Sequence, residues 1–208
     1  MTQGIIVTGT DTSVGKTVFA AALAQALGAT YWKPIQCGLD GGSDSAHVRT
    51  IAGLPPDRIL PEAYRLNLPA SPHRAAEAEG IEISLARLKL PEVEGPLVVE
   101  GAGGLMVPVT RQALQIDVFA SWRLPVVLVA RTALGTINHS LLSIEALNGR
   151  NIPILGIAFV GDEVADSEHT ISGMGNVRRL GRLPRLDSLE PAHLAQAFAD
   201  HFRVEDFR

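Results

Sequence analysis

Residues 5–17 read Ile-Ile-Val-Thr-Gly-Thr-Asp-Thr-Ser-Val-Gly-Lys-Thr, and this stretch decides the fold. The apolar run at 5–8 predicts a buried strand, and a helical pattern over 18–27 follows the loop directly. A glycine turn between a strand and a helix is typical of loops whose backbone N–H groups hold phosphates at the positive end of the helix dipole. The stretch therefore predicts a phosphate-binding loop, with a chance Gly-Lys-Thr after an ordinary turn as the alternative.

The last residues of this loop indicate that its ligand is a nucleoside triphosphate. Lys16 supplies a mobile positive charge, and the Thr17 hydroxyl can join the coordination shell of Mg²⁺. The standard phosphate-loop pattern has glycine where this chain has Thr10, so the match is one residue short. We expect ATP to contact Thr12, Ser13, Val14, Gly15, Lys16, Thr17 and Val18.

Lysine is rare in this chain. Of the 18 basic residues only Lys16, Lys33 and Lys89 are lysine, and the rest are arginine. A retained lysine suggests a place that needs a compact, flexible ammonium rather than a planar guanidinium. Lys33 is therefore a second candidate for chemistry, unless it is simply a solvated strand end.

Composition narrows the class of protein. The 208 residues are 46% hydrophobic with a net charge of −4, which predicts a globular protein and favours neither nucleic acid nor membrane as a partner. The single cysteine, Cys37, fits a cytoplasmic protein without disulfides. Four arginines between 178 and 185 are expected to form a solvated face or a strand end near the nucleotide.

Short apolar runs alternate with helical patterns along the chain. The predicted strands are residues 5–9, 30–35, 97–100, 126–131, 154–160 and 179–183. The predicted helices are residues 17–27, 45–52, 84–88, 114–121, 137–148 and 192–202. Helices that cross between parallel strands give an α/β fold with a doubly wound, mostly parallel sheet, here P-loop NTPase-like and forming one domain over residues 1–208.

Ligands of such sheets collect at the carboxyl ends of the strands. Lys33 and Glu100 end two predicted strands, and Asp44 follows in a glycine-rich turn. Mg²⁺ prefers carboxylate, phosphate and water oxygens. We therefore expect Thr17, Asp44 and Glu100 to bind Mg²⁺, although Glu100 alone could be an ordinary strand-end carboxylate.

Taken together, these motifs make the chain resemble the dethiobiotin synthetases, the ATP-dependent ligases of the penultimate step of biotin synthesis. The resemblance rests on residues 9–17, on Lys33-Pro34, Ser71-Pro72-His73 and Glu100-Gly101-Ala102-Gly103-Gly104, and on the sequence Leu-Gly-Thr-Ile-Asn-His at 134–139. These motifs occur in family order, and their combination is far more specific than the phosphate loop alone.

The resemblance implies a definite reaction. 7,8-Diaminononanoate takes up CO₂ as a carbamate, the carbamate attacks the γ-phosphate of ATP, and the resulting carbamic-phosphoric anhydride closes to a cyclic urea. Lys33 and Lys16 would be the catalytic lysines, and a homodimer is implied. The implied nucleotide contacts include Asp44, Glu100, Gly101, Ala102, Gly103, Pro184, Arg185 and Leu186. The implied substrate contacts are Cys37, Ser71 and Pro72, with Gly135, Thr136 and Asn138 receiving the substrate carboxylate from a neighbouring subunit.

The chain departs from the family pattern in three places. Ser13 replaces a frequent glutamate or other polar residue, and Cys37 replaces an expected serine or threonine. Val160-Gly161 stands where an asparagine commonly contacts adenine, so loose base selectivity is expected. We place Cys37 on the turn beside Lys33 with its thiolate favoured, against the alternative of a buried cysteine acting as a small hydrophobe.

Two other functions share this fold. A dimerising partition-type switch ATPase carries a signature lysine where this chain has Asp11, and an acidic residue cannot supply that charge across a dimer interface. The ATP-using amidation module of cobalamin synthesis would need a glutaminase partner domain, and a lone cysteine without a nucleophile elbow argues against one in this chain.

Overall fold

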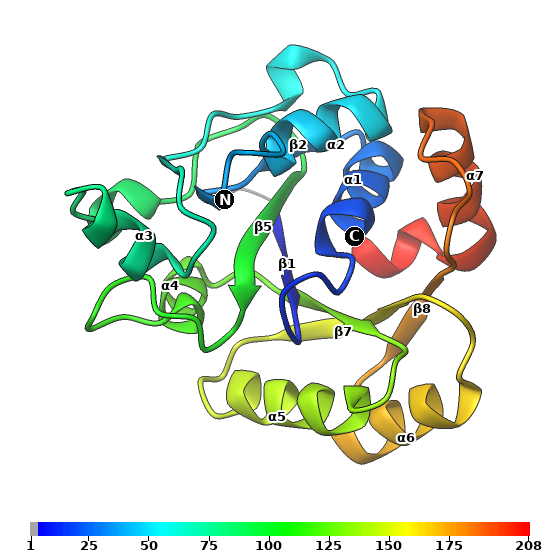
Figure 1. Cartoon of the computed structure of the whole chain (residues 1–208). Coiled ribbons are helices and arrows are strands. Elements are labelled where there is room, and N and C mark those ends of the chain that lie inside the picture. The colour runs from blue at the N-terminus through cyan, green and yellow to red at the C-terminus, as the bar shows by residue number, and fades with distance from the viewer. Residues whose placement is uncertain (1–3) are drawn as a thin grey trace.

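A computed structural model describes residues 4–208, and its centre is a six-stranded sheet in which every pair of neighbouring strands is parallel (Figure 1). The strands are β1 (Gly4–Gly9), β2 (Thr30–Trp32), β5 (Leu97–Gly104), β6 (Val126–Arg131), β7 (Ile154–Val160) and β8 (Arg179–Leu183). The α-helices are α1 (Lys16–Leu27), α2 (Asp44–Ala52), α3 (Pro72–Ala78), α4 (Gln115–Trp122), α5 (Thr136–Asn148), α6 (Ala165–Gly175) and α7 (Pro191–His201). Short 3₁₀ helices are η1 (Pro56–Arg58), η2 (Leu85–Leu88) and η3 (Val204–Phe207).

Helices cover both faces of the sheet because its strands are apolar on both sides. In β1, Ile5 and Val7 pack into the core beneath α1, α2 and α7, whereas Ile6 packs with Phe119 of α4 on the other face. Helices α5 and α6 cover the same face as α4 further along the sheet (Figure 1). This arrangement confirms the predicted α/β fold with its doubly wound parallel sheet.

The strand order β2-β5-β1-β6-β7-β8 places β1 at the point where the winding reverses. The chain passes from β1 through α1 to the β2 side, and it later returns to β6 on the other side of β1. The carboxyl end of β1 therefore opens into the crevice where ligands of such folds bind. The phosphate loop lies at this end.

The predicted strand 30–35 is wrong, because the chain breaks at Lys33-Pro34. β2 ends at Trp32, and Ile35–Cys37 form β3, which pairs in parallel with β4 (Tyr64–Leu66) in a separate two-stranded sheet. Pro34 has no N–H to donate to a strand ladder; its carbonyl instead accepts from the Tyr64 N–H at 3.1 Å. The break frees Lys33 to point into the crevice.

Other differences are local. β5 continues through Gly104 instead of ending at Glu100, and residues 85–88 form a 3₁₀ helix rather than an α-helix. Helices α3 and α6 and strand β4 are missing from the sequence-based prediction. Helix α6 contains Gly173 and Gly175 and buries few residues, so its helical pattern is weak in the sequence.

The arginine cluster at 178–185 forms ion pairs with carboxylates. Arg178 pairs with Asp206, and Arg185 pairs with Asp162. The other two, Arg179 and Arg182, both contact the buried carboxylate of Glu168 on α6. Within residues 4–208, no helix combines the length and apolar character needed to cross a membrane.

Candidate active site

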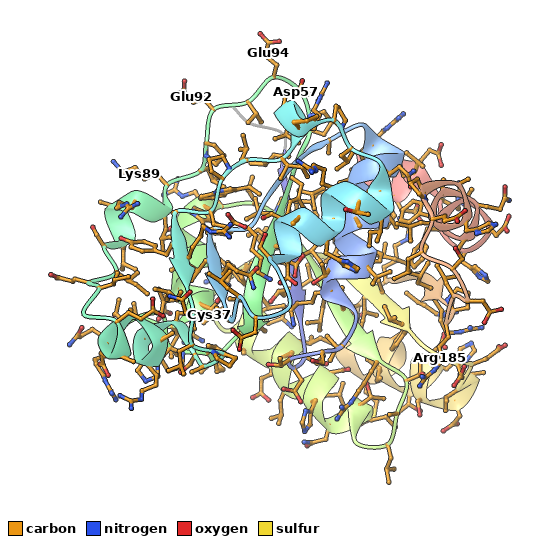
Figure 2. The ribbon with its side chains drawn as sticks, turned by 45° about the horizontal axis from the view of Figure 1, so that its top comes forward. Cys37, Asp57, Lys89, Glu92, Glu94 and Arg185 are labelled. Carbon is orange, nitrogen blue, oxygen red and sulfur yellow. The ribbon has the colours of Figure 1, made fainter. Side chains whose placement is uncertain are left out.

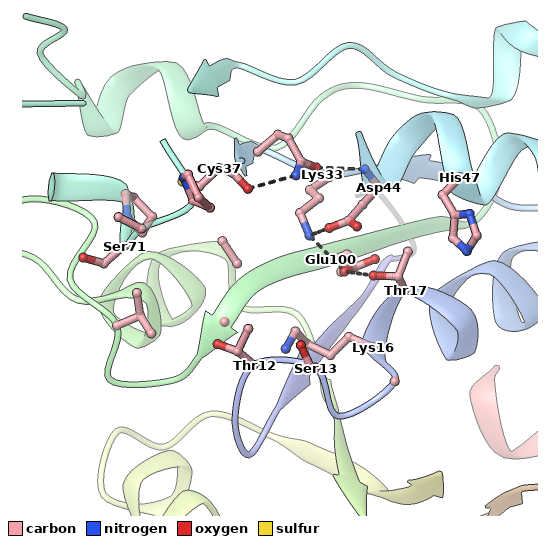
Figure 3. A pocket seen from close by; sticks show the side chains of 18 of the residues that line it. Thr12, Ser13, Lys16, Thr17, Lys33, Cys37, Asp44, His47, Ser71 and Glu100 are labelled. Carbon is pink, nitrogen blue, oxygen red and sulfur yellow. Dashed lines mark hydrogen bonds and ion pairs between the residues drawn. The ribbon is translucent and has the colours of Figure 1, made fainter. Parts of the chain in front are cut away.

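A cavity of about 690 Å³ opens at the carboxyl ends of β1 and β5. Its lining comes from the phosphate loop, from the β2–β3 break, from the start of α2 and from the loop before α3 (Figure 3). The residues are Thr12, Ser13, Gly15, Lys16, Thr17, Val18, Lys33, Gln36, Cys37, Asp44, His47, Pro69, Ala70, Ser71, Pro72, Glu100, Ala102, Gly103 and Val107.

The phosphate loop takes its shape from residues that adopt the left-handed region. Gly15 caps the start of α1 with φ of 94°, and Ser13 has φ of 56°. A β-carbon at Gly15 would lie 2.7 Å from Cγ1 of Val160, so the end of β7 packs directly against the loop. Lys16 folds back over the loop, and its Nζ donates to the Asp11 carbonyl at 2.7 Å.

Burial controls the charge of Lys16. The residue is 6% exposed, and this burial lowers the pKa of the ammonium to about 8 even though Glu100 acts in the opposite direction. A triphosphate bound in the loop would bring negative charge to the ammonium and favour its protonated form.

Lys33 lies between two carboxylates (Figure 3). Its ammonium donates to Asp44 and, at 3.0 Å, to Oε1 of Glu100. The same Glu100 oxygen accepts from the Thr17 hydroxyl at 2.9 Å, and its second oxygen accepts from the Tyr31 hydroxyl at 2.7 Å. This network joins the β2–β3 break, α2, β5 and the start of α1.

The surroundings of Lys33 and Glu100 rule out the ordinary alternatives for both. Lys33 is 5% exposed rather than solvated, and Glu100 is fully buried rather than a surface carboxylate. Burial by itself would lower the pKa of Lys33, but Glu100 and Asp44 together outweigh it and raise that pKa. The structure thus holds a charged ammonium beside the phosphate loop.

Local hydrogen bonds fix the position of Asp44. Ser43 caps α2 by accepting the Ala46 N–H, and the side-chain oxygen of Gln36 accepts the Asp44 N–H at 2.9 Å. Asp44 therefore enters the site as the first residue of α2, next to β3. The sequence pattern predicted neither this cap nor the role of Gln36.

The oxygens of Thr17, Asp44 and Glu100 form a donor set suited to Mg²⁺. Within residues 4–208, no group of three or more His, Cys, Asp or Glu residues could hold a metal ion by itself. A hydroxyl and two carboxylates gathered around one ammonium nevertheless match the hard-oxygen preference of Mg²⁺, which takes its remaining ligands from phosphate and water. The residues present fit the ion.

Cys37 and Ser71 line the part of the cavity that lies away from α2 (Figure 3), and Pro72 also lines the cavity. Cys37 was predicted to lie on the turn beside Lys33; it shares the cavity with Lys33, but it is the last residue of strand β3 rather than part of a turn. The predicted thiolate is wrong: burial raises the pKa of the thiol to about 11, and the nearby charge of Lys33 offsets only part of that effect.

Several expected site residues lie outside this cavity lining. Val14 is buried in the core, and Gly101 packs against Gln115 and Phe119. At the start of α5, Gly135 and Asn138 are exposed, while Thr136 is buried with its hydroxyl donating to the Arg131 carbonyl. The loop Pro184-Arg185-Leu186 follows β8, and Figure 2 shows Arg185 well separated from Cys37.

The cavity also contains residues that the sequence reading missed. These are Gln36, His47, Pro69, Ala70 and Val107. His47 stands one helical turn after Asp44, and this spacing could have placed both residues on one face of α2. Gln36 and Ala70 carry no comparable signal, because their positions depend on the β2–β3 break and on the small sheet.

Comparison with known proteins shows the family to which the chain belongs. Residues 3–193 match the family model described as "AAA domain". A protein from Novosphingobium aromaticivorans, named ATP-dependent dethiobiotin synthetase BioD, is 65% identical over 97% of this chain and 98% of its own length. A protein of the same name from Rhodopseudomonas palustris is 63% identical over all of this chain and 99% of its own. The chain belongs to the dethiobiotin synthetase family.

Solved structures support the fold of this dethiobiotin synthetase family member. The MinC:MinD cell division complex of Aquifex aeolicus aligns with a TM-score of 0.57 at 14% identity, covering 94% of this chain and 86% of the other. A ParA family ATPase from Chlorobium tepidum aligns with a TM-score of 0.51 at 12% identity, covering 96% and 97%. At these identities the likeness concerns the fold alone.

Proposed function

We propose that this chain synthesises dethiobiotin from 7,8-diaminononanoate, CO₂ and ATP, and that the whole chain acts as one catalytic domain. Family membership supports the ATP-dependent synthesis. The observation that carries the mechanism is the buried Lys33 ammonium, which is held by Asp44 and Glu100 beside the phosphate loop.

The proposed reaction has three steps. One amine of the diamine attacks CO₂ and loses a proton, which gives a carbamate. A carbamate oxygen then attacks the γ-phosphorus of ATP, and ADP leaves with the electrons of the broken P–O bond. Finally the second amine attacks the carbonyl carbon of the carbamic-phosphoric anhydride, releasing phosphate and a proton as the cyclic urea closes.

The chemical problem is to bring two anions together. Carbamate and triphosphate repel each other, so the protein must offset negative charge and fix the line of attack. Lys16 extends along the phosphate loop, where it would follow the phosphates, and Lys33 would face the carbamate. Both ammonium groups are buried, and charge stabilisation is stronger in such surroundings than in water.

Mg²⁺ would be held by Thr17, Asp44 and Glu100. Its contribution when bound is to neutralise charge on the β- and γ-phosphate oxygens. The protein holds these donors ready: Tyr31 and Thr17 donate to Glu100, and Ser43 and Gln36 orient Asp44.

We also infer a homodimer in the cytoplasm. The cavity of one chain offers Cys37, Ser71 and Pro72 to the substrate, while Gly135 and Asn138 at the start of α5 lie outside that cavity and are exposed. A helix start binds anions through its free N–H groups. The α5 start of a neighbouring subunit would therefore receive the substrate carboxylate.

Phosphate release tests the function. Purified protein is mixed with Mg-ATP and bicarbonate, with and without the diamine, and the release of phosphate is followed. We expect release only with the diamine. Turnover that is independent of the diamine would contradict the proposal and indicate a switch ATPase of the MinD or ParA kind.

A further inference from the structure

We infer that Gln115 is a positioning residue for the reaction, because its side-chain amide holds the backbone of Ala102 at the wall of the cavity. The inference rests on the proposed function, since it assigns a role in that reaction. Gln115 is the first residue of α4, it is 6% exposed, and it does not line the cavity described above.

The backbone held by Gln115 is a bulge in β5. Val7 of β1 pairs with Glu100, but the next pair joins Gly9 to Gly104, so three residues of β5, 101–103, face one residue of β1. On the opposite side, β2 ends with Trp32 paired to Val99. The strands that support β5 up to Glu100 therefore do not continue their regular ladder over residues 101–103.

The side-chain amide of Gln115 forms hydrogen bonds with the β5 backbone at the point where the regular strand ladder is interrupted. With its nitrogen facing the Ala102 carbonyl, it donates there at 3.0 Å, and its oxygen accepts the Ala102 N–H at 2.8 Å. One side chain thus satisfies both backbone groups of a residue, as a neighbouring strand would. The backbone of Gln115 is itself fixed, because its N–H donates to the Val107 carbonyl at 2.9 Å.

Gly101 allows the amide to come this close. A β-carbon at Gly101 would lie 2.8 Å from the end of the Gln115 side-chain amide and 2.7 Å from Cζ of Phe119. Any larger residue would push the amide away from Ala102. The glycine and the glutamine are therefore two parts of one local arrangement.

The bulge forms the wall that faces the phosphate loop. Ala102 and Gly103 line the cavity, and a β-carbon at Gly103 would lie 3.6 Å from the Thr12 hydroxyl oxygen. This wall lies next to Glu100, where the carbamate and the γ-phosphate must meet. A displacement of about 1 Å in such a wall can cost roughly a hundredfold in rate.

Gln115→Met tests the inference, because methionine has a similar volume but forms no amide hydrogen bonds. Gln25→Met is the matched control: the Gln25 side chain also donates to a backbone carbonyl, that of Pro191 at 3.0 Å, but at the far end of α1. We expect kcat to fall at least tenfold in Gln115→Met, by a larger factor than any rise in the Kd for ATP, and to stay within about twofold in Gln25→Met.

A second variant of Gln115 and a hydrogen-exchange measurement complete the test. Gln115→Asn retains the amide but is one methylene shorter, so it covers the case in which the methionine variant does not fold. Hydrogen exchange at the Ala102 N–H should be faster in either folded Gln115 variant than in the parent, because the N–H loses its acceptor. Parent-like exchange at Ala102, or a kcat as high as that of Gln25→Met, would overturn the inference. Failure of the parent to turn over the diamine would instead contradict the proposed function.

Discussion

At the scale of single residues, the two buried lysines have different surroundings. Lys16 contacts a backbone carbonyl of its own loop, and burial lowers its pKa to about 8. Lys33 contacts two carboxylates, which raise its pKa above the usual value against the effect of burial. Under the proposed function the first lysine would serve the phosphates and the second the reacting carbamate, so the two should support different steps.

Alanine substitutions should separate these steps. Lys33→Ala removes a charge stabiliser, and we expect turnover to fall roughly 10²–10³-fold while ATP binding is retained. Lys16→Ala should weaken ATP binding itself. Lys33→Arg should rescue poorly, because a planar guanidinium does not fit a buried site built for an ammonium. Calorimetric ATP binding and single-turnover rates check this, and near-normal turnover in Lys33→Ala would remove Lys33 from the mechanism.

Cys37 should react slowly at neutral pH. Its pKa of about 11 leaves roughly one thiol in a thousand ionised at pH 8. The rate of alkylation should therefore rise about tenfold per pH unit from 7 to 10, and bound diamine with Mg-ATP should slow it. Mass spectrometry of iodoacetamide-treated protein measures the rate, with Cys37→Ser as an active, unmodified control. A rate that levels off near pH 8 would show that the thiolate is stabilised after all.

The sequence placed Cys37 correctly but not its chemistry. Two residues separate it from Pro34, and that spacing was enough to locate it near Lys33. The burial that raises its pKa depends on the small β3–β4 sheet and on the loop before α3, neither of which the local sequence predicts. The positions of Lys33 and Glu100 were predictable because each follows an apolar run, and that of Asp44 because it follows in a glycine-rich turn.

At the scale of elements, we expect the residue at the end of β7 to affect how strictly the site selects the nucleotide base. Val160 packs against Gly15 of the phosphate loop, and its side chain offers no hydrogen bond to a base. Strong rejection of a wrong base requires polar groups that the wrong base leaves unpaired. We expect other nucleoside triphosphates to work within about tenfold of ATP.

Initial rates with ATP, GTP and CTP test this selectivity. Val160→Asn restores an amide at this position and should widen the difference between bases. A hundredfold or greater preference of the parent for ATP would show that another residue reads the base.

The attachment of α6 to β8 depends on a buried carboxylate. Glu168 is 2% exposed and pairs with Arg179 at 2.6 Å and with Arg182 at 3.0 Å. Glu168→Ala would leave Arg182, whose side chain is 14% exposed, with only Glu163 as a partner, whereas Arg179 is 40% exposed and can be hydrated. This loss of charged hydrogen bonds should lower the free energy of unfolding by about 2 kcal/mol. Glu163 pairs with the same Arg182 but is exposed, and Glu163→Ala should cost less than about 1 kcal/mol. Urea unfolding compares the two, and equal losses would contradict this account.

Elements with a strong apolar pattern were predictable, whereas those set by single hydrogen bonds were not. The six strands of the main sheet and the helices that cover them follow from the alternation of apolar runs. The break at Pro34 has a local signal, because proline lacks the N–H of a strand ladder, but the pairing of β3 with β4 and the bulge held by Gln115 depend on partners distant in the sequence. Both features shape the cavity.

At the scale of the whole molecule, the fold and the reaction are separate questions. MinD and ParA ATPases share the fold at 12–14% identity, so architecture alone does not distinguish a switch from a ligase. We expect the difference to lie in the site: the chain has Asp11 where a signature lysine is expected of a switch ATPase, and under the proposed function Lys33 would lie where a second substrate meets the γ-phosphate.

In the proposed reaction, ATP drives the incorporation of CO₂ into a cyclic urea. The most direct measurement supplies ¹⁴C-bicarbonate, the diamine and Mg-ATP, and compares acid-stable radioactivity with phosphate released. A carbamate loses its CO₂ in acid, whereas a cyclic urea retains it. We expect one acid-stable ¹⁴C atom for each phosphate released. In Lys33→Ala we expect both the acid-stable label and the released phosphate to be lost. Phosphate release without acid-stable label would contradict the proposed reaction.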